Sequence, residues 1–182
     1  MAQEVMEIDK AKAIEKSLEI ANTLKEQFAH EVLDISEFRG QVSVIVKREK
    51  IKEILRYLKE KQGFNHLQDL CGVDYYPAEP RFEVVYNLYS ISRRLHLRIK
   101  AKVYERESEI ASITELWSGA NWHERECFDM FGIRFTGHPD LRRILMPEDW
   151  DGHPLRKDYP LKGRELWKGF REILAPEVEV DD

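Results

Sequence analysis

The sequence predicts an α+β fold: a two-layer domain with a mixed or antiparallel sheet and helices on one face, followed by a long extended C-terminal arm. Apolar residues recur at helical spacing in residues 9–29 and again in residues 49–62. Several alternating segments predict strands, and few of these are joined by a helical crossover. After Gly132 no period is sustained, and Pro, Gly, Arg and Asp are frequent. We therefore divide the chain into a core domain, residues 1–132, and an arm with an acidic tail, residues 133–182.

Two helices and a hairpin are predicted at the start of the chain. Residues 31–46 predict two short strands that turn at Arg39-Gly40. Residues 49–62 return to helical spacing, and Gly63 is suited to end that helix. The first helix carries its apolar side chains on one face, namely Ile14, Leu18, Ala21, Leu24 and Phe28.

Three further strands are predicted in the middle of the chain. The first lies near residues 67–73, and the segment Pro77–Pro80 then breaks the chain. Residues 82–89 and 95–103 alternate between apolar and polar side chains, which predicts a hairpin with one buried face. The polar face of residues 95–103 is basic, so we expect an acidic neighbour such as Glu83 beside it.

Two helices are predicted before the arm. Residues 112–115 have the form of a capping box and predict a short helix through Trp117. The next helix begins at Asn121, which can cap it together with Glu124 three residues on. Gly132 is placed to end that helix.

The arm has no secondary-structure element of its own in this prediction. A long segment of this kind in a compact domain is uncommon and usually functional. Alone, it buries too little apolar surface to offset its ordering entropy. We therefore expect it to become ordered against another protein, with Arg142, Arg143, Arg156 and Asp158 paired across that interface.

Composition argues against several classes of protein. The 182 residues are 42% hydrophobic and 35% charged with a net charge of −5, which gives no global reason to expect nucleic-acid binding. No apolar run approaches the length of a membrane span. Cys71 and Cys127 are the only cysteines, and without a C-x-x-C pair they argue against an iron–sulfur cluster held within this chain. Neither phosphate-loop motif occurs.

One group of residues could bind a metal. His123 and Cys127 lie four residues apart, so a helix would place them on one face, and Glu124 imitates the general base of H-E-x-x-H. A third ligand would have to come from His138 or His153. However, Cys127 stands where that motif needs His and lies among apolar residues, so a buried structural cysteine is the stronger interpretation.

Charged residues crowd the helix that begins at Asn121. Arg125 lies among Glu124, Glu126 and Asp129. One Arg among three carboxylates suits a bidentate ion-pair network. Such a network is structural or interfacial and does not indicate acid–base catalysis.

This helix and the arm together resemble a known signature. It comprises Glu124-Arg125-Glu126, Asp129-Met130-Phe131-Gly132, His138-Pro139, Arg142-Arg143-Ile144-Leu145 and the segment from Gly152 to Pro160. The pattern is similar to that of the C-subunit family of respiratory complex I, the 30 kDa subunit of proton-pumping NADH:quinone oxidoreductase. The upstream order of helices and strands also fits the α+β domain of that family.

The resemblance implies a non-redox subunit of the peripheral arm, with a structural or assembly role in electron transfer from NADH to quinone and in the coupled ion translocation. It implies no metal or cofactor in this chain, while FMN, iron–sulfur clusters, NADH and quinone belong to the holoenzyme. The implied partners are the D subunit (49 kDa type) and the cluster-bearing B and I subunits, with no nucleic acid. Membrane association at the cytoplasmic face would be peripheral and made through partners only. The implied partner-binding residues are Glu124, Arg125, Glu126, Asp129, His138, Arg142, Arg143, His153, Arg156, Lys157, Asp158 and Tyr159.

Three alternatives remain open at this point, and one of them is a scaffold protein with a basic strand and no link to respiration. The family is similar to subunits of membrane-bound hydrogenases and of quinone oxidoreductases fed by other donors, and sequence separates these poorly. An alternative of another class is a zinc hydrolase that uses His123, Glu124 and Cys127.

Overall fold

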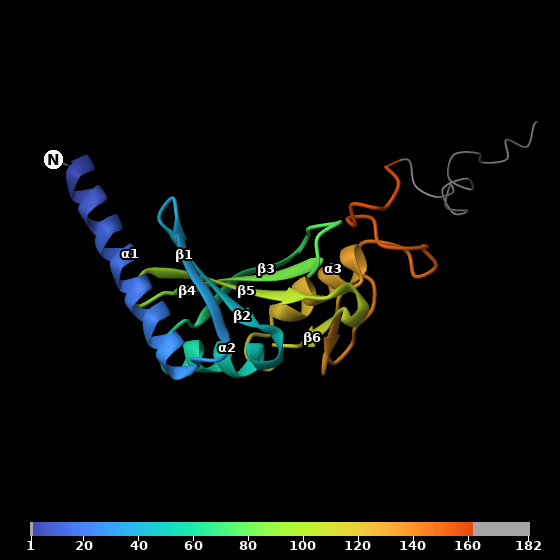
Figure 1. Ribbon diagram of the computed structural model, residues 1–182, viewed down its shortest axis with the longest axis horizontal. Coiled ribbons are helices and arrows are strands. Elements are labelled where there is room, and N and C mark those ends of the chain that lie inside the picture. Colours follow the sequence, from blue (N-terminus) through green and yellow to red (C-terminus); the bar gives the residue numbers. More distant parts are fainter. Residues whose placement is uncertain (1, 162–182) are drawn as a thin grey trace, which may run out of the picture.

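The computed structural model describes residues 2–161, so the acidic tail that we assigned to the arm lies outside the described residues. Figure 1 shows the elements in sequence colours. In chain order they are α1 (Ala2–Gln27), β1 (Val32–Phe38), β2 (Gln41–Lys47), η1 (Arg48–Lys50), α2 (Ile51–Glu60), β3 (His66–Asp74), β4 (Phe82–Ser90), β5 (Leu95–Val103), η2 (Glu105–Glu107), β6 (Glu109–Ala111), α3 (Ala120–Phe131) and β7 (Arg134–Thr136).

Five strands form one mixed sheet in the order β1-β2-β5-β4-β3. β2 and β5 pair in parallel, and the other neighbouring strands of this sheet pair antiparallel. Buried side chains of α2 and α3 belong to one core cluster with the inward side chains of the sheet. Figure 1 shows α2 below the sheet and α3 towards its right-hand end. The predicted mixed sheet with helices on one face is confirmed.

The outer face of β5 is polar, as its alternation predicts. The inward residues from Leu95 to Val103 are buried, whereas His96 and Lys102 are exposed. Lys100 Nζ lies 3.3 Å from the Glu83 carboxylate on β4, which is the expected acidic neighbour. No helix covers this basic face in Figure 1.

The N-terminal helix packs across one end of the sheet. Ile20, Ala21 and Leu24 are buried in the core, and the N-terminus of α1 projects away from the sheet (Figure 1). The β1–β2 hairpin turns at Arg39 and Gly40, whose φ values of 52° and 84° are those of a tight two-residue turn. Within residues 2–161, no helix has both the length and the apolar character that a membrane span requires.

The prediction of a short helix from Ser112 to Trp117 is wrong. The N–H groups of Leu116 and Trp117 both donate to the Ile113 carbonyl, at 2.9 and 3.1 Å, so the segment makes a single turn. It follows β6, which pairs in parallel with β7 in a two-stranded sheet that we did not predict. Strands of three residues are too short to show alternation.

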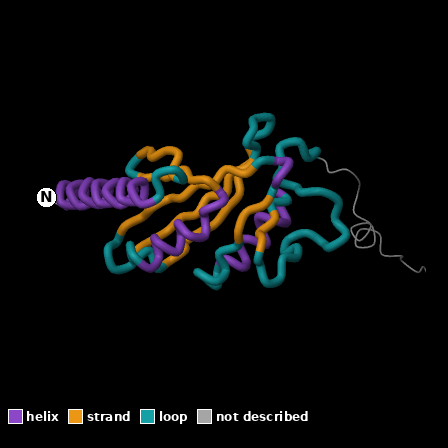
Figure 2. Tube along the Cα trace, turned by 60° about the horizontal axis from the view of Figure 1, so that its bottom comes forward, coloured by secondary structure: helices purple, strands orange, loops and turns teal. Residues whose placement is uncertain are grey.

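The arm follows β7 and is loop throughout as far as Leu161 (Figure 2). β7 itself lies after Gly132, in the segment that we assigned to the arm, yet its Phe135 is buried in the core. The first residues of that segment therefore complete the core domain, and the loop begins after them.

Candidate functional site

The signature residues gather where the end of α3 meets the arm. Gly132 ends α3 with φ of 76°, and its N–H donates to the Phe128 carbonyl at 2.9 Å, as predicted. A Cβ at this position would lie 2.6 Å from both Arg156 Nη2 and His153 Nε2. Glycine is therefore required both for the left-handed backbone and for the close return of the arm over the helix end.

Asp129 is fully buried on α3 and holds one loop of the arm. Its Oδ2 accepts hydrogen bonds from the N–H groups of Ile144, Leu145 and Met146 at 3.0, 2.8 and 2.8 Å. Its Oδ1 lies 2.6 Å from Arg143 Nη1. Burial by itself would raise the pKa of Asp129, but these donors outweigh burial and lower the pKa below its ordinary value.

Arg143 binds the far end of the same loop. Its Nη2 donates to the carbonyl groups of Trp150 and Gly152, at 2.9 and 3.1 Å. His153 then returns to α3, where its Nδ1 lies 2.9 Å from the Asp129 carbonyl oxygen and must carry the proton of that bond. Burial lowers the pKa of His153, so the neutral ring is the form that fits here.

Arg125 supports this loop from the side. Its Nε donates to the Arg142 carbonyl at 3.2 Å and its Nη2 donates to the Arg143 carbonyl at 3.0 Å. The guanidinium carbon lies 5.2 Å from the centre of the Trp122 ring, in cation–π geometry. The planar group thus fixes two successive carbonyls of the arm to α3.

The contacts of Asp129 and Arg143 with the arm are its first anchor. A second anchor, centred on Arg81, joins the arm to the sheet. Arg81 is 1% exposed and binds Asp74 through Nε and Nη2 at 3.0 and 2.9 Å. Its Nη1 also reaches Glu105 at 2.6 Å and Asp158 at 3.1 Å. The Lys157 N–H donates to Asp74 at 2.8 Å. Hydrogen bonds to Asp74 and then to Asp158 raise the pKa of Arg81, and the bond from Arg81 lowers the pKa of Asp158.

Arg156 lies between the two anchors. Its Nε donates to the Phe131 carbonyl at 2.6 Å, and its guanidinium carbon lies 5.1 Å from the centre of the Phe82 ring. Arg81 packs against the same ring at 5.0 Å. Burial, and then the positive charge of Arg81, lower the pKa of Arg156, while Glu105 at 3.8 Å offsets part of that repulsion.

The structure corrects our expectation that Arg143 and Asp158 find their partners across an interface with another protein. Arg143 binds Asp129, and Asp158 binds Arg81, within the same chain. Both bonds fix the arm to its own core domain.

Other predicted site residues remain accessible. Glu126, Arg142 and Lys157 are exposed, and Arg142 Nε lies 3.0 Å from the Asp140 carboxylate. His138 is partly buried, with Nε2 3.3 Å from the Asn121 carbonyl oxygen. The Tyr159 hydroxyl donates to the Asp151 carbonyl at 3.2 Å.

Sequence reasoning missed Asp74, Arg81 and Glu105. Arg81 follows the proline-rich break and is 77 residues away from Asp158 in the sequence. Neither the spacing nor the composition of either segment indicates such a contact. The segment Pro77–Pro80 predicted only that a loop precedes Arg81.

Glu124 does not take part in a cap, contrary to our prediction. α3 begins at Ala120 with no side-chain cap at Gly119. Glu124 is fully buried, and its Oε1 accepts a hydrogen bond from the Ile113 N–H at 2.7 Å. Its Oε2 has no hydrogen-bond partner within the part of the chain that the structure describes. Burial raises the pKa of Glu124 from 4.5 to about 7.

This raised pKa predicts a dependence of stability on pH. Between pH 4.5 and about 7 the unfolded chain releases a proton that the folded chain keeps, so stability falls by about 3 kcal/mol as pH rises. Above pH 7 this contribution is constant. Urea unfolding of the isolated chain at several pH values measures it, and Glu124→Gln should remove that slope. An equal slope in both proteins would contradict the assignment.

His123, Glu124 and Cys127 do not form a metal site. His123 Nδ1 lies 3.6 Å from Asp69, and Glu124 faces the Ile113 N–H. Cys127 is buried in the core, and burial raises the pKa of its thiol well above the ordinary value. Among the side chains of residues 11–161, no group of three or more His, Cys, Asp or Glu is placed to hold a metal ion. The zinc-hydrolase alternative is therefore not favoured.

Comparison with known proteins bears on the same segments. The family described as "Respiratory-chain NADH dehydrogenase, 30 Kd subunit" matches residues 44–165, which include α3, both anchors and the described arm. The chain belongs to this 30 kDa subunit family. It is therefore a subunit of NADH-quinone oxidoreductase, respiratory complex I.

Curated relatives of the 30 kDa family agree over most of their length. The C subunit of the NADH-quinone oxidoreductase of Geobacter sulfurreducens is 54% identical over 149 residues, which are 80% of this chain and 92% of that protein. The equivalent C subunit of Roseiflexus sp. is 50% identical over 169 residues, 92% of this chain and 93% of that protein. These relatives favour the complex I assignment over the related-complex alternative.

Solved structures show the same fold. A trypsin-resistant fragment of Nqo5 is 34% identical with a TM-score of 0.61, covering 71% of this chain and 99% of the fragment. A chain of an archaeal membrane-bound sulfane sulfur reductase is 22% identical with a TM-score of 0.68, covering 92% of this chain and 95% of that one. The second likeness concerns the fold alone.

Proposed function

We propose that this 30 kDa-family chain is a non-catalytic subunit whose anchored arm binds the D subunit (49 kDa type), beside the cluster-bearing B and I subunits. It holds no redox centre, and FMN, iron–sulfur clusters, NADH and quinone are bound by other parts of the complex. It lies at the cytoplasmic face of the membrane and is attached there through these partners.

The observation that carries this proposal is that the core domain holds the backbone of the arm while three leucine side chains of the arm are exposed. Leu145 and Leu155 are 60% and 53% exposed, and Leu161 is fully exposed. The backbone beside Leu145 is fixed by Asp129, and the backbone beyond Leu155 is fixed by Asp74. A preorganised apolar surface loses little entropy when it binds, so it suits a permanent protein contact.

The chemistry of the junction supports a structural role. Asp129 and Arg143 direct their hydrogen bonds to backbone groups and to each other. Arg81 does the same with carboxylates of its own chain. A catalytic group needs at least one bonding direction open to a substrate, and these groups use theirs to shape the arm.

The double variant Leu145→Asp/Leu155→Asp tests the contact. Both side chains are exposed, so the unfolding free energy of the isolated chain should change by less than about 1 kcal/mol. In cells the amount of assembled complex that copurifies with the tagged chain should fall severalfold, because each Asp places a charge in an apolar contact. Ile91→Asp, at an equally exposed site in the β4–β5 turn, is the matched control. Normal assembly of the double variant would reject the arm as the contact surface.

The isolated chain should be colourless and inactive. Purified chain is expected to contain no stoichiometric zinc or iron and to oxidise no NADH with a quinone acceptor. Elemental analysis and a spectrophotometric assay check this expectation. Visible absorbance with bound iron, or NADH oxidation by the pure chain, would overturn the non-catalytic assignment.

A further inference from the structure

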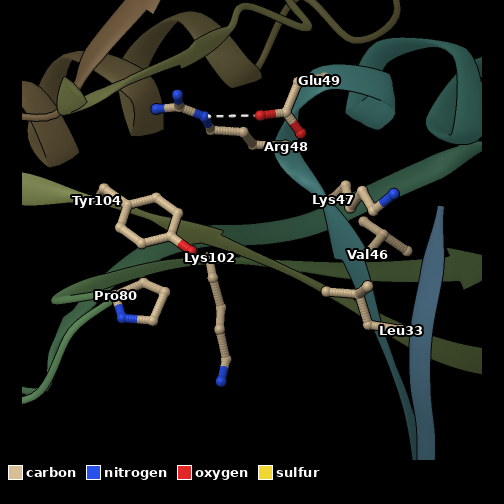
Figure 3. A pocket seen from close by; sticks show the side chains of 8 residues that line it. All are labelled: Leu33, Val46, Lys47, Arg48, Glu49, Pro80, Lys102 and Tyr104. Atoms are coloured by element: carbon tan, nitrogen blue, oxygen red, sulfur yellow. Dashed lines mark hydrogen bonds and ion pairs between the residues drawn. The ribbon is translucent and has the colours of Figure 1, made fainter.

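A pocket of about 400 Å³ lies where the parallel strands β2 and β5 end side by side (Figure 3). Its walls are largely apolar, with Leu33 from β1, Pro80 and the Tyr104 ring. The ammonium-bearing side chains of Lys47 and Lys102 border the same space. The pocket thus combines an apolar surface with concentrated positive charge.

Lys47 and Lys102 are direct neighbours in the β2–β5 register. Register partners project from the same face of a sheet, and like charges placed opposite each other destabilise it. Lys47 Nζ lies 3.7 Å from the Glu31 carboxylate, and Glu49 of the pocket also lies within its electrostatic reach. Among residues 11–161, Lys102 forms no ion pair, and the carboxylate of its β4 neighbour Glu83 lies 3.3 Å from Lys100 Nζ instead. The fold therefore places Lys102, which has no ion pair among residues 11–161, directly beside Lys47.

The other charged groups of the pocket compensate each other. Arg48 lies 3.1 Å from Glu49 and also pairs with Glu107. Arg48 further donates to the carbonyl groups of Glu107 and Glu109. The positive charge that an incoming group meets is thus mainly that of Lys102, with Lys47 beside it.

The apolar walls are open to solvent. Leu33 is 54% exposed and Tyr104 is 40% exposed. A small ligand is normally enclosed over most of its surface. Open apolar walls beside uncompensated charge instead fit a segment of protein that carries an apolar side chain next to a carboxylate.

We propose that this pocket receives an acidic, amphipathic segment of another subunit of the complex. One of its carboxylates pairs with Lys102, beside Lys47, and its apolar side chain packs on Leu33 and Tyr104. The proposal rests on membership in the complex and concerns a contact separate from that of the arm.

Photo-crosslinking in the intact complex tests the occupant. A benzoylphenylalanine placed at Leu33 or at Tyr104 should crosslink to a peptide of another subunit that contains at least two acidic residues. The same group at Ile91 should give no such product. No crosslink from either position, a crosslink to the acidic tail of this chain, or a crosslink to a non-protein molecule would overturn the proposal. The crosslink is readable in any assembled complex, so it does not depend on which partner the arm binds.

The double variant Lys47→Gln/Lys102→Gln separates binding from folding. Removing the repulsion should raise the melting temperature of the isolated chain by roughly 1–3 °C. The same change should weaken retention of the chain in the complex by at least roughly tenfold in salt washes, because it removes charged hydrogen bonds. Lys12→Gln/Lys61→Gln, at two exposed lysines, is the charge-matched control. Unchanged retention would show that these lysines make no contact in the complex, and a lowered melting temperature would show that they stabilise the fold. Either result would overturn the proposal.

Discussion

The Asp129→Ala chain is expected to lose on the order of 3–5 kcal/mol of unfolding free energy. The substitution removes the acceptor of three arm N–H groups and leaves the mostly buried Arg143 guanidinium without its carboxylate. Unfolded groups of this kind are solvated, whereas the folded chain would keep them unpaired. Urea unfolding of the isolated chain measures the loss, which is large against the stability of an ordinary domain.

Asp129→Asn is the matched control, because it keeps the shape and one acceptor oxygen but removes the charge. The unfolding free energy of Asp129→Asn should lie between that of the native chain and that of Asp129→Ala. The low pKa of Asp129 fixes the sign of the pH dependence: its contribution is present above the ordinary value of 3.8 and disappears as pH falls through the lowered folded value. The native chain and Asp129→Ala should therefore converge in acid. A difference below about 1 kcal/mol at neutral pH would contradict the anchor.

Arg81→Met is expected to have an effect of similar size, on the order of 3–5 kcal/mol, because it leaves the buried Asp74 carboxylate without its main counter-charge. It should also free the second anchor, since Asp158 loses its partner and Lys157 loses its correctly placed acceptor. Faster trypsin cleavage after Arg156 or Lys157, compared by mass spectrometry, reports this release.

Asp158→Ala gives the matched comparison for that release. Its carboxylate is partly exposed, so solvent screening limits the loss to about 1 kcal/mol or less, while Arg81 keeps Asp74 and Glu105. The two variants should therefore share the faster cleavage but differ in unfolding free energy. Equal unfolding free energies of Arg81→Met and the native chain would show that Asp74 is solvated and that its contact with Arg81 does not stabilise the fold.

The elements that the sequence predicts well are those with a sustained period. α2 and β5 each bury one regular face, and their patterns are long enough to identify the element. In β4 the prediction of one buried face is wrong, because residues 82–86 are buried on both faces. β6 and β7 have three residues each and show no period. The segment from Ser112 carries a capping-box pattern, but its Ser112 N–H bonds to the Thr136 carbonyl, so tertiary pairing decides its conformation.

The site was predicted as a set of residues, and its contacts were not. Asp129, Arg143 and Arg156 stood out because charges recur around α3 and in the arm. Apart from the ion pair between Asp129 and Arg143, their bonding partners are mainly backbone carbonyl and N–H groups, which every residue has and no sequence pattern marks. Glu124 imitates a cap residue in sequence, yet its burial depends on how α3 packs against the turn at Ile113. The sequence shows the type of each side chain, but it does not show the direction in which the side chain points.

The contact between Arg81 and Asp158 also orders events during synthesis. The segment between them contains β4, β5, β6, α3 and β7, so the ribosome releases all five strands of the main sheet before the carboxylate that closes the second anchor. The arm can find its place only on a sheet that has already formed. A chain whose sheet has not folded therefore cannot hold the arm in its bound conformation. Only folded subunits can then present this surface to the other subunits during assembly.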